Sequence, residues 1–269
     1  MIKRIALALL ALVVIVYVAA LGVLYFKQRD FQYEPGTKVW TLQETTATGI
    51  EPISITVPGG AVVNGWYKPP VGEKPTILFY KGNTDSFGSD HVRFERWTAD
   101  GYGFLAFDYR GFPASPGSIS QENMLADALA VFDWLQARED HIVIWGRSIG
   151  TGPATYTASQ READALLLET PYLSTVKVGQ ERYWYMPIAW LMHDQFPSED
   201  WIRTVDEPVM VAHGTGDRTI PVHHGEGLFK LAPNGKQIWI EPGAGHSDLW
   251  AAGLPDRAEA FFEAVEAAR

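Results

Sequence analysis

The 269-residue sequence predicts an α/β protein, in which a mostly parallel, eight-stranded sheet is flanked by helices and preceded by one transmembrane helix. Two observations carry this prediction. Short apolar runs of strand length alternate along the chain with amphipathic helical patterns, an order typical of a parallel sheet wrapped by helices. Near the N-terminus, the 22 residues of Ile5–Phe26 carry no charge.

The run Ile5–Phe26 is the first predicted element. As a helix it would be about 33 Å long, enough to cross a hydrocarbon core of roughly 30 Å. Basic residues before the run and the small residues Val18-Ala19-Ala20 leave a cleaved signal peptide as the alternative. Because the apolar run continues beyond that cleavage site, the sequence favours a retained membrane anchor over residues 1–30, followed by one folded domain over residues 31–269.

The net charge of −10 is divided unevenly between these two parts. Residues 1–30 carry +3 and residues 31–269 carry −13. Phosphates repel an acidic domain, which excludes nucleic-acid binding as a function class. The slight excess of positive charge ahead of the apolar run predicts a cytoplasmic N-terminus and an extracytoplasmic domain, with secretion after signal cleavage as the alternative. The chain has no Cys, which excludes disulfides, a thiolate nucleophile and Cys-ligated zinc.

Strands and helices alternate over the rest of the chain. Three β-type stretches separated by Gly and Pro signals predict an antiparallel opening of the sheet: Lys38–Leu42, Ile53–Val57 and Val62–Lys68. Six compact apolar runs predict buried parallel strands: Thr76–Tyr80, Gly103–Phe107, Ile142–Trp145, Ala165–Leu168, Val209–Ala212 and Ile238–Ile240. Ser120 is expected to cap a helix with one apolar face, and a similar helix is expected around Ala258–Val265. Reactive groups in such sheets gather at the carboxyl ends of the strands.

The first candidate for chemistry follows the strand Ile142–Trp145. The motif Gly146-Arg147-Ser148-Ile149-Gly150 places Ser148 between two glycines in a strand-turn-helix context, which fits the sharp turn that presents a nucleophilic hydroxyl above a sheet. We expect a Cβ at either glycine position to collide with the neighbouring strand or helix. A Gly/Ser turn without chemistry is the alternative for the motif taken alone.

A serine hydroxyl needs a histidine to accept its proton, and that histidine needs a carboxylate to orient it. Of the seven histidines, His246 follows the last predicted strand in a Gly-rich loop within reach of Ser148. Asp217 lies in the loop at the carboxyl end of Val209–Ala212. The chain order Ser148, Asp217, His246 is the serine–acid–histidine order expected for a triad on successive strands of such a sheet. His213, at the end of the same strand, is expected to have a packing role.

Acyl transfer also needs two main-chain N–H donors for the oxyanion. Ile149 follows the nucleophile, and the loop after Thr76–Tyr80 reads Lys81-Gly82-Asn83. The predicted donors are therefore the main-chain N–H groups of Ile149 and Asn83. These motifs imply neither a metal nor an organic cofactor.

Several motifs together resemble the α/β-hydrolase superfamily, and most closely its BEM46/ABHD13-type branch of membrane-anchored serine hydrolases. They are Leu78–Asn83, Phe107-Asp108-Tyr109-Arg110-Gly111-Phe112, Gly146–Ala154, His213–Asp217 and Gly245-His246. The resemblance covers residues 38–269 and implies the α/β-hydrolase fold. Relatives usually carry His-Gly-Asn where this chain has Lys81-Gly82-Asn83. The motif Asp108-Tyr109-Arg110-Gly111 resembles a structural signature of the family, which we interpret as a loop-anchoring ion pair.

Residues 171–204 are longer than a simple crossover between two strands, and the resemblance implies a cap or lid in this interval. The interval holds many large apolar side chains: Tyr183, Trp184, Tyr185, Met186, Trp190, Leu191, Met192, Phe196 and Trp201. Ordinary helix packing, the lining of an acyl pocket and contact with the bilayer all stay open for these side chains.

The sequence therefore predicts a serine hydrolase that cleaves carboxylic esters of small or lipid-like acyl substrates through an acyl-enzyme, with thioesters or amides as alternative substrates. Two alternatives stay open. One is a serine peptidase or aminopeptidase that uses the same triad. The other is a non-catalytic, membrane-tethered binding protein on a hydrolase scaffold.

Overall fold

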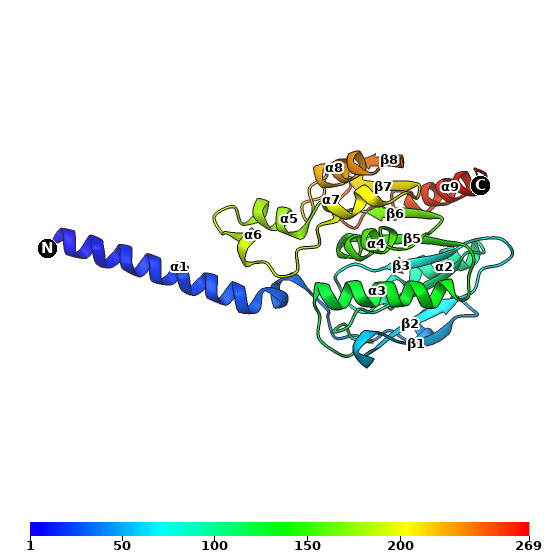
Figure 1. Cartoon of the computed structure of the whole chain (residues 1–269), viewed down its shortest axis with the longest axis horizontal. Coiled ribbons are helices and arrows are strands. Elements are labelled where there is room, and N and C mark those ends of the chain that lie inside the picture. The colour runs from blue at the N-terminus through cyan, green and yellow to red at the C-terminus, as the bar shows by residue number, and fades with distance from the viewer. Residues whose placement is uncertain (269) are drawn as a thin grey trace.

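The computed structural model describes residues 1–268 as a long N-terminal helix that projects from a sheet wrapped by helices (Figure 1). Over these residues the sheet has eight strands in the order β1-β2-β4-β3-β5-β6-β7-β8. β2 pairs antiparallel with β1 and β4, and every later pair is parallel. The strands are β1 Glu51–Thr56, β2 Val62–Lys68, β3 Thr76–Tyr80, β4 Gly103–Phe107, β5 Ile142–Arg147, β6 Ala165–Glu169, β7 Val209–Gly214 and β8 Gly235–Glu241. The prediction of a mostly parallel, eight-stranded sheet is confirmed.

One strand prediction is wrong. Lys38–Leu42 forms no strand, and the chain turns instead into the short 3₁₀ helix η1 Leu42–Glu44. The main-chain N–H of Thr41 donates to the Glu44 carboxylate over 2.8 Å, and the Trp40 ring stacks on His91. The edge strand of the sheet is β1, and Lys38–Leu42 does not pair with it. The stretch makes these local contacts instead.

Helices cover both faces of the sheet. On one face lie α3 Gln121–Gln136, α4 Thr151–Ala158 and α8 His223–Leu231, and on the other lie α2 His91–Ala99 and α9 Leu254–Glu266. Alternate residues of a strand serve the two cores. In β3, Leu78 and Tyr80 belong to the first core, whereas Ile77 and Phe79 belong to the second. This double burial explains why the parallel strands read as continuous apolar runs.

The two helices expected from the sequence are present. Ser120 caps α3, because its hydroxyl oxygen accepts a hydrogen bond of 3.1 Å from the Asn123 main-chain N–H. In α9, Ala258, Phe261 and Phe262 are buried against the sheet. Further short 3₁₀ helices are η2 Pro58–Gly60, η3 Phe87–Asp90, η4 Ser148–Gly150 and η5 Ile202–Thr204.

The N-terminal helix α1, Ile2–Gln32, contains the predicted apolar run Ile5–Phe26, and none of its residues is buried. Within residues 1–268 it is the one helix that is long and apolar enough to cross a membrane, which is consistent with a membrane protein. The C-terminal end of α1 lies beside α5 Thr175–Arg182 and α6 Ile188–Leu191 (Figure 1). Both helices, and α7 Ser198–Trp201 after them, belong to the interval 171–204.

Candidate active site

Ser148 lies on a tight turn between β5 and α4. Its φ of +52° is in the left-handed region, which is strained for a residue with a side chain. A Cβ on Gly150 would lie 2.2 Å from the Tyr80 carbonyl oxygen, and one on Gly146 would lie 2.6 Å from the Ala154 Cβ. Both glycines are therefore required sterically, as the sequence predicted. The turn that carries Ser148 packs directly against the end of β3.

The structure brings together the three residues that were predicted to act on one another. His246 Nε2 lies 2.8 Å from Ser148 Oγ, and His246 Nδ1 lies 2.7 Å from Asp217 Oδ2. Since a carboxylate only accepts hydrogen bonds, Nδ1 carries the ring hydrogen and Nε2 is free to accept the hydroxyl proton. The three side chains follow the carboxyl ends of β5, β7 and β8.

Asp217 is buried and fully hydrogen-bonded. Its Oδ1 accepts from the main-chain N–H groups of Thr219 and Ile220, over 2.8 and 2.9 Å. Burial alone would raise the pKa of Asp217, but hydrogen bonds from His213 and His246 outweigh burial and hold the pKa well below its ordinary value. The carboxylate is therefore ionised at neutral pH.

His213 has more than the packing role expected from the sequence. Its ring is fully buried, and its Nε2–H donates to the Ile220 carbonyl oxygen over 2.8 Å. The same nitrogen lies 3.3 Å from Asp217 Oδ2. His213 thus holds the end of β7 to the loop that carries Asp217, and it contacts the Asp217 carboxylate itself. The sequence signal for this role was the position of His213 at the end of a strand, four residues before Asp217.

Lys81 organises the loop that carries the second predicted oxyanion donor. The side chain is buried, and Nζ donates to the carbonyl oxygens of Gly82, Thr84 and Asp85 over 3.0, 3.3 and 2.7 Å. Burial lowers the pKa of Lys81 to about 8, although neighbouring carboxylates, Asp108 first among them, act in the opposite direction. Lys81 therefore closes the turn in which Asn83 lies.

Asn83 and Ile149 line the same cavity as Ser148. The Asn83 side chain is turned toward α1, because its Nδ2 donates to the Gln32 carbonyl oxygen over 2.9 Å and its Oδ1 accepts from the Glu34 main-chain N–H over 3.3 Å. The loop is thereby fastened to the end of the N-terminal helix. No local sequence pattern around Asn83 indicates this contact.

A buried polar network lies at the carboxyl ends of β5 and β6, next to the turn that carries Ser148. Arg93 donates to both oxygens of Glu169 over 2.8 and 2.9 Å, and the Trp145 indole N–H donates to the same carboxylate over 3.0 Å. Arg147 donates to Ser247 Oγ over 3.2 Å, so it joins the turn that carries Ser148 to the loop that carries His246. Charges at the ends of apolar strands were the only sequence signal for this network.

The contacts of the motif Asp108-Tyr109-Arg110-Gly111 are structural. Its ion pair joins Arg110 to Asp127, which lies outside the motif. Arg110 Nε lies 2.7 Å from Asp127 Oδ2 on α3. The Asp108 carboxylate accepts from the main-chain N–H groups of Phe87 and Ala114, over 2.7 and 2.8 Å. Together these bonds fix the loop after β4 against its neighbours.

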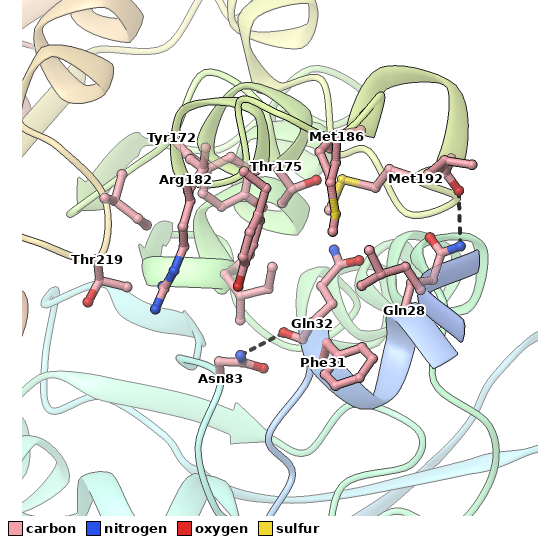
Figure 2. A pocket seen from close by; sticks show the side chains of 18 of the residues that line it. Gln28, Phe31, Gln32, Asn83, Tyr172, Thr175, Arg182, Met186, Met192 and Thr219 are labelled. Atoms are coloured by element: carbon pink, nitrogen blue, oxygen red, sulfur yellow. Dashed lines mark hydrogen bonds between the residues drawn. The ribbon is translucent and has the colours of Figure 1, made fainter. Parts of the chain in front are cut away.

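A cavity of about 450 Å³ lies over Ser148. Figure 2 shows its walls: Gln28, Phe31 and Gln32 come from α1, while Thr175 and Met186 come from the interval 171–204. Most of the lining is apolar, and the volume suits one small ligand or part of a lipid. The exceptions to the apolar lining include Arg182, which points from α5 toward the side where Thr219 and Asn83 lie (Figure 2).

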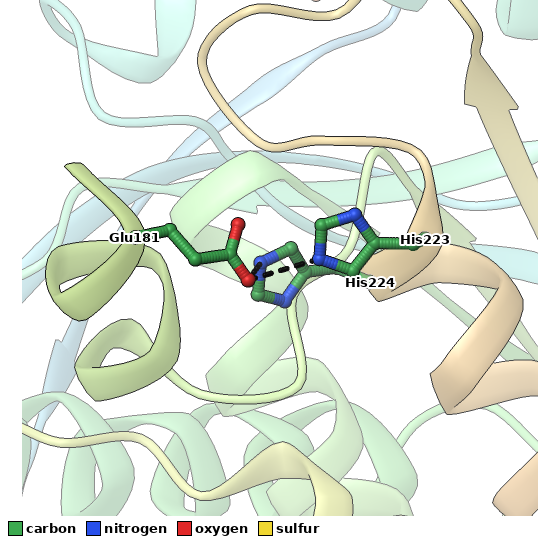
Figure 3. Close-up of side chains that lie close together, drawn as sticks. All are labelled: Glu181, His223 and His224. Carbon is green, nitrogen blue, oxygen red and sulfur yellow. Dashed lines mark hydrogen bonds and ion pairs between the residues drawn. The ribbon is translucent and has the colours of Figure 1, made fainter. Parts of the chain in front are cut away.

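Glu181, His223 and His224 form a cluster between α5 and α8 (Figure 3). Glu181 Oε1 lies 2.9 Å from His223 Nε2 and 3.5 Å from His224 Nε2. However, His224 Nδ1 accepts the main-chain N–H of Leu173, so the neutral ring carries its hydrogen on Nε2, where a metal would have to bind. The cluster fits a polar contact between two helices better than a metal site.

The sheet order and the strained serine turn define the class of protein: the chain belongs to the α/β-hydrolase superfamily. It is 32% identical over 251 residues to an uncharacterized protein of Mycobacterium tuberculosis, Rv2307c, with 89% of this chain and 88% of that protein covered. It is also 32% identical over 196 residues to lysophosphatidylserine lipase ABHD12 of Xenopus tropicalis, with 64% of this chain and 51% of that protein covered.

Among solved structures, the esterase Pf2001 of Pyrococcus furiosus matches with a TM-score of 0.69 at 20% identity, over 86% of this chain and 97% of that chain. This likeness shows the fold. No protein-family model matches the chain.

Proposed function

We propose that the protein is a membrane-anchored serine hydrolase that cleaves carboxylic esters of lipid-like acyl substrates. The observation that carries the proposal is the pair of hydrogen bonds that joins Ser148 through His246 to Asp217, with Ser148 lining an apolar cavity. The names of relatives and structural neighbours, a lysophosphatidylserine lipase and esterases, support ester substrates.

In the proposed mechanism, Ser148 Oγ attacks the ester carbonyl carbon while His246 Nε2 takes the hydroxyl proton. The main-chain N–H groups of Ile149 and Asn83 stabilise the oxyanion of the tetrahedral intermediate. His246 then gives its proton to the leaving alkoxide, and an acyl-enzyme remains. Water, deprotonated by His246, then attacks the acyl carbon, the bond to Ser148 Oγ breaks, and His246 returns the proton to Ser148 as the acid leaves. Throughout, Asp217 orients the ring and stabilises the imidazolium.

The test is hydrolysis of short p-nitrophenyl esters by the full chain and by Ser148→Ala. We expect the variant to lose at least about 10³-fold in kcat, since a triad acts as a unit. Ser159→Ala, which removes a hydroxyl at the end of α4, is the matched control and should keep full activity. Equal rates for Ser148→Ala and the full chain would contradict the proposal. Faster turnover of peptides than of esters would favour a peptidase instead.

We further propose that residues 1–30 are the anchor, that residues 31–269 are the hydrolase domain and that residues 171–204 form its cap. The proposed orientation places the domain outside the cytoplasm. A C-terminal reporter that is active only in the cytoplasm should then be silent, and an active reporter would reverse the orientation.

A further inference from the structure

The stretch Tyr183–Leu191 exposes large apolar side chains without any charge among them. Trp184 and Trp190 are 82% and 88% exposed, and neither lines the cavity over Ser148. Isolated apolar residues are common on protein surfaces, but a continuous uncharged stretch with two fully presented tryptophans marks a surface for a partner or a membrane.

This stretch lies along the C-terminal half of α1. The Tyr17 hydroxyl donates to the Tyr185 carbonyl oxygen over 2.9 Å, and Gln28 Nε2 donates to the Leu191 carbonyl oxygen over 3.0 Å. Tyr17 precedes the end of the apolar run at Phe26 by about 13 Å of helix. If α1 spans a bilayer, these contacts carry Tyr183–Leu191 into the same bilayer.

Part of the main chain of the stretch is paired by hydrogen bonds of its own. The N–H groups of Tyr183, Met186, Ile188 and Trp190 all donate to carbonyl oxygens within residues 179–187. The carbonyls of the stretch that face α1 accept from Tyr17 and Gln28, as described. The main-chain N–H groups of Trp184 and Tyr185 have no acceptor among the described residues, so the stretch suits the interfacial region of a bilayer, where water and headgroups supply partners. Tyr and Trp are also the side chains enriched at membrane interfaces.

The contact between α1 and this interval is reinforced by a polar clamp just beyond the apolar run. The Asp194 carboxylate accepts from Arg29 Nε over 2.9 Å and from the Tyr33 hydroxyl over 3.0 Å. Asp194 is buried. The position of Tyr183–Leu191 relative to α1 is therefore held by contacts at both of its ends.

We propose that Tyr183–Leu191 is a second, non-spanning membrane contact, inserted beside α1, and that the cavity between them takes its acyl chain directly from the bilayer. The second part rests on the proposed hydrolase function. The cavity has α1 on one side, with Leu24 and Phe31, and Met186 and Ile188 on the other. The substrate class that fits is an acyl ester resident in the membrane. Continuity with the apolar face of α1 identifies the bilayer, and not a second protein, as the occupant of this surface.

The absence of Cys allows a direct test of depth. Trp190→Cys, labelled with an environment-sensitive fluorophore, is reconstituted as the full chain in phosphatidylcholine vesicles that contain nitroxide-labelled lipid. We expect blue-shifted emission that the nitroxide lipids quench. Val71→Cys, which replaces an exposed apolar residue in the turn between β2 and β3, is the matched control and should be neither shifted nor quenched.

A Trp190 label that behaves like the Val71 label would overturn the proposal. A blue shift without quenching would also overturn it, because protein and not lipid would then cover the surface. Neither outcome depends on catalysis. The membrane contact can therefore be disproved while the proposed hydrolase function stands, and the hydrolase function can be disproved while the membrane contact stands.

A kinetic measurement tests the route of the substrate. For Trp184→Ser/Trp190→Ser, the rate on an ester carried in vesicles, divided by the rate on a soluble ester, should fall by about tenfold. Val71→Ser should leave this ratio unchanged. An unchanged ratio in the double variant would contradict delivery from the bilayer.

Discussion

The floor and the roof of the cavity are built on different principles. The floor lies at the carboxyl ends of β5 and β7, where Ser148 lines the cavity and is joined by hydrogen bonds to His246 and through it to Asp217. The roof consists of α5, α6 and the end of α1, with exposed aromatic side chains and few buried ones. We infer that the floor determines the chemistry, whereas the roof determines which substrate reaches it.

The largest expected effect comes from the floor. Asp217→Asn should lower kcat by about 10³–10⁴-fold on every ester, whatever its chain length, because His246 loses the partner that fixes its tautomer. The measurement is kcat on short and long p-nitrophenyl esters. Asp140→Asn, an exposed carboxylate ahead of β5, is the control. A loss that is confined to long chains would assign Asp217 to substrate binding and would break the distinction between floor and roof.

The second effect concerns the stability of the floor. Arg93→Met leaves the buried Glu169 carboxylate without its main partner, so the free energy of unfolding should fall by about 3–5 kcal/mol. Urea unfolding measures this change. The control is Arg161→Met, which breaks a half-exposed pair with Asp133 and should cost less than about 1 kcal/mol. Equal losses in the two variants would show that the network below Ser148 is not structurally important.

The third effect is a pH dependence at the oxyanion loop. Burial lowers the pKa of Lys81 from 10.5 to about 8, so between these values the unfolded chain binds a proton that the folded chain does not. The contribution of neutral Lys81 to the free energy of unfolding is fully present above pH 10.5, the pKa in the unfolded chain. It is lost as the pH falls through about 8, the pKa in the folded chain. Relative to Lys81→Met, the free energy of unfolding should therefore rise by about 2 kcal/mol between pH ~8 and ~10. A difference that is independent of pH would contradict the burial of this amine.

The floor could be predicted from the sequence because its signals are local. The glycines around Ser148, the strand before it and the order Ser148, Asp217, His246 each follow from the chain itself. Eight of the nine predicted strand runs also form strands. The exception is Lys38–Leu42, which has no neighbouring strand edge and folds into local contacts.

The roof could not be predicted in the same way, because its contacts join residues far apart in the chain. Nothing local to Arg29 or Asp194 indicates that they pair, and nothing local to Asn83 indicates that it contacts Gln32. His213 is an intermediate case: its strand-end position was visible, but its contact with Asp217 depends on how the loop closes.

The smallest expected effect comes from the roof. Asp194→Asn weakens the clamp on Arg29, which is partly exposed, so the change should cost about 1 kcal/mol or less. We expect at most about a fivefold loss on long-chain esters and a smaller one on short esters. Asp30→Asn, which removes the exposed partner of Lys27, is the control and should change neither rate. Equal losses on short and long esters would indicate that the roof also shapes the floor.

Covalent labelling tests the central claim most directly. The full chain is treated with a fluorophosphonate, and the site of modification is mapped by mass spectrometry of its peptides. We predict one adduct per chain, on Ser148, that is absent from Ser148→Ala and strongly reduced in His246→Ala. A chain that takes up no fluorophosphonate, or that carries the adduct on a different residue, would contradict the assignment of Ser148 as the nucleophile.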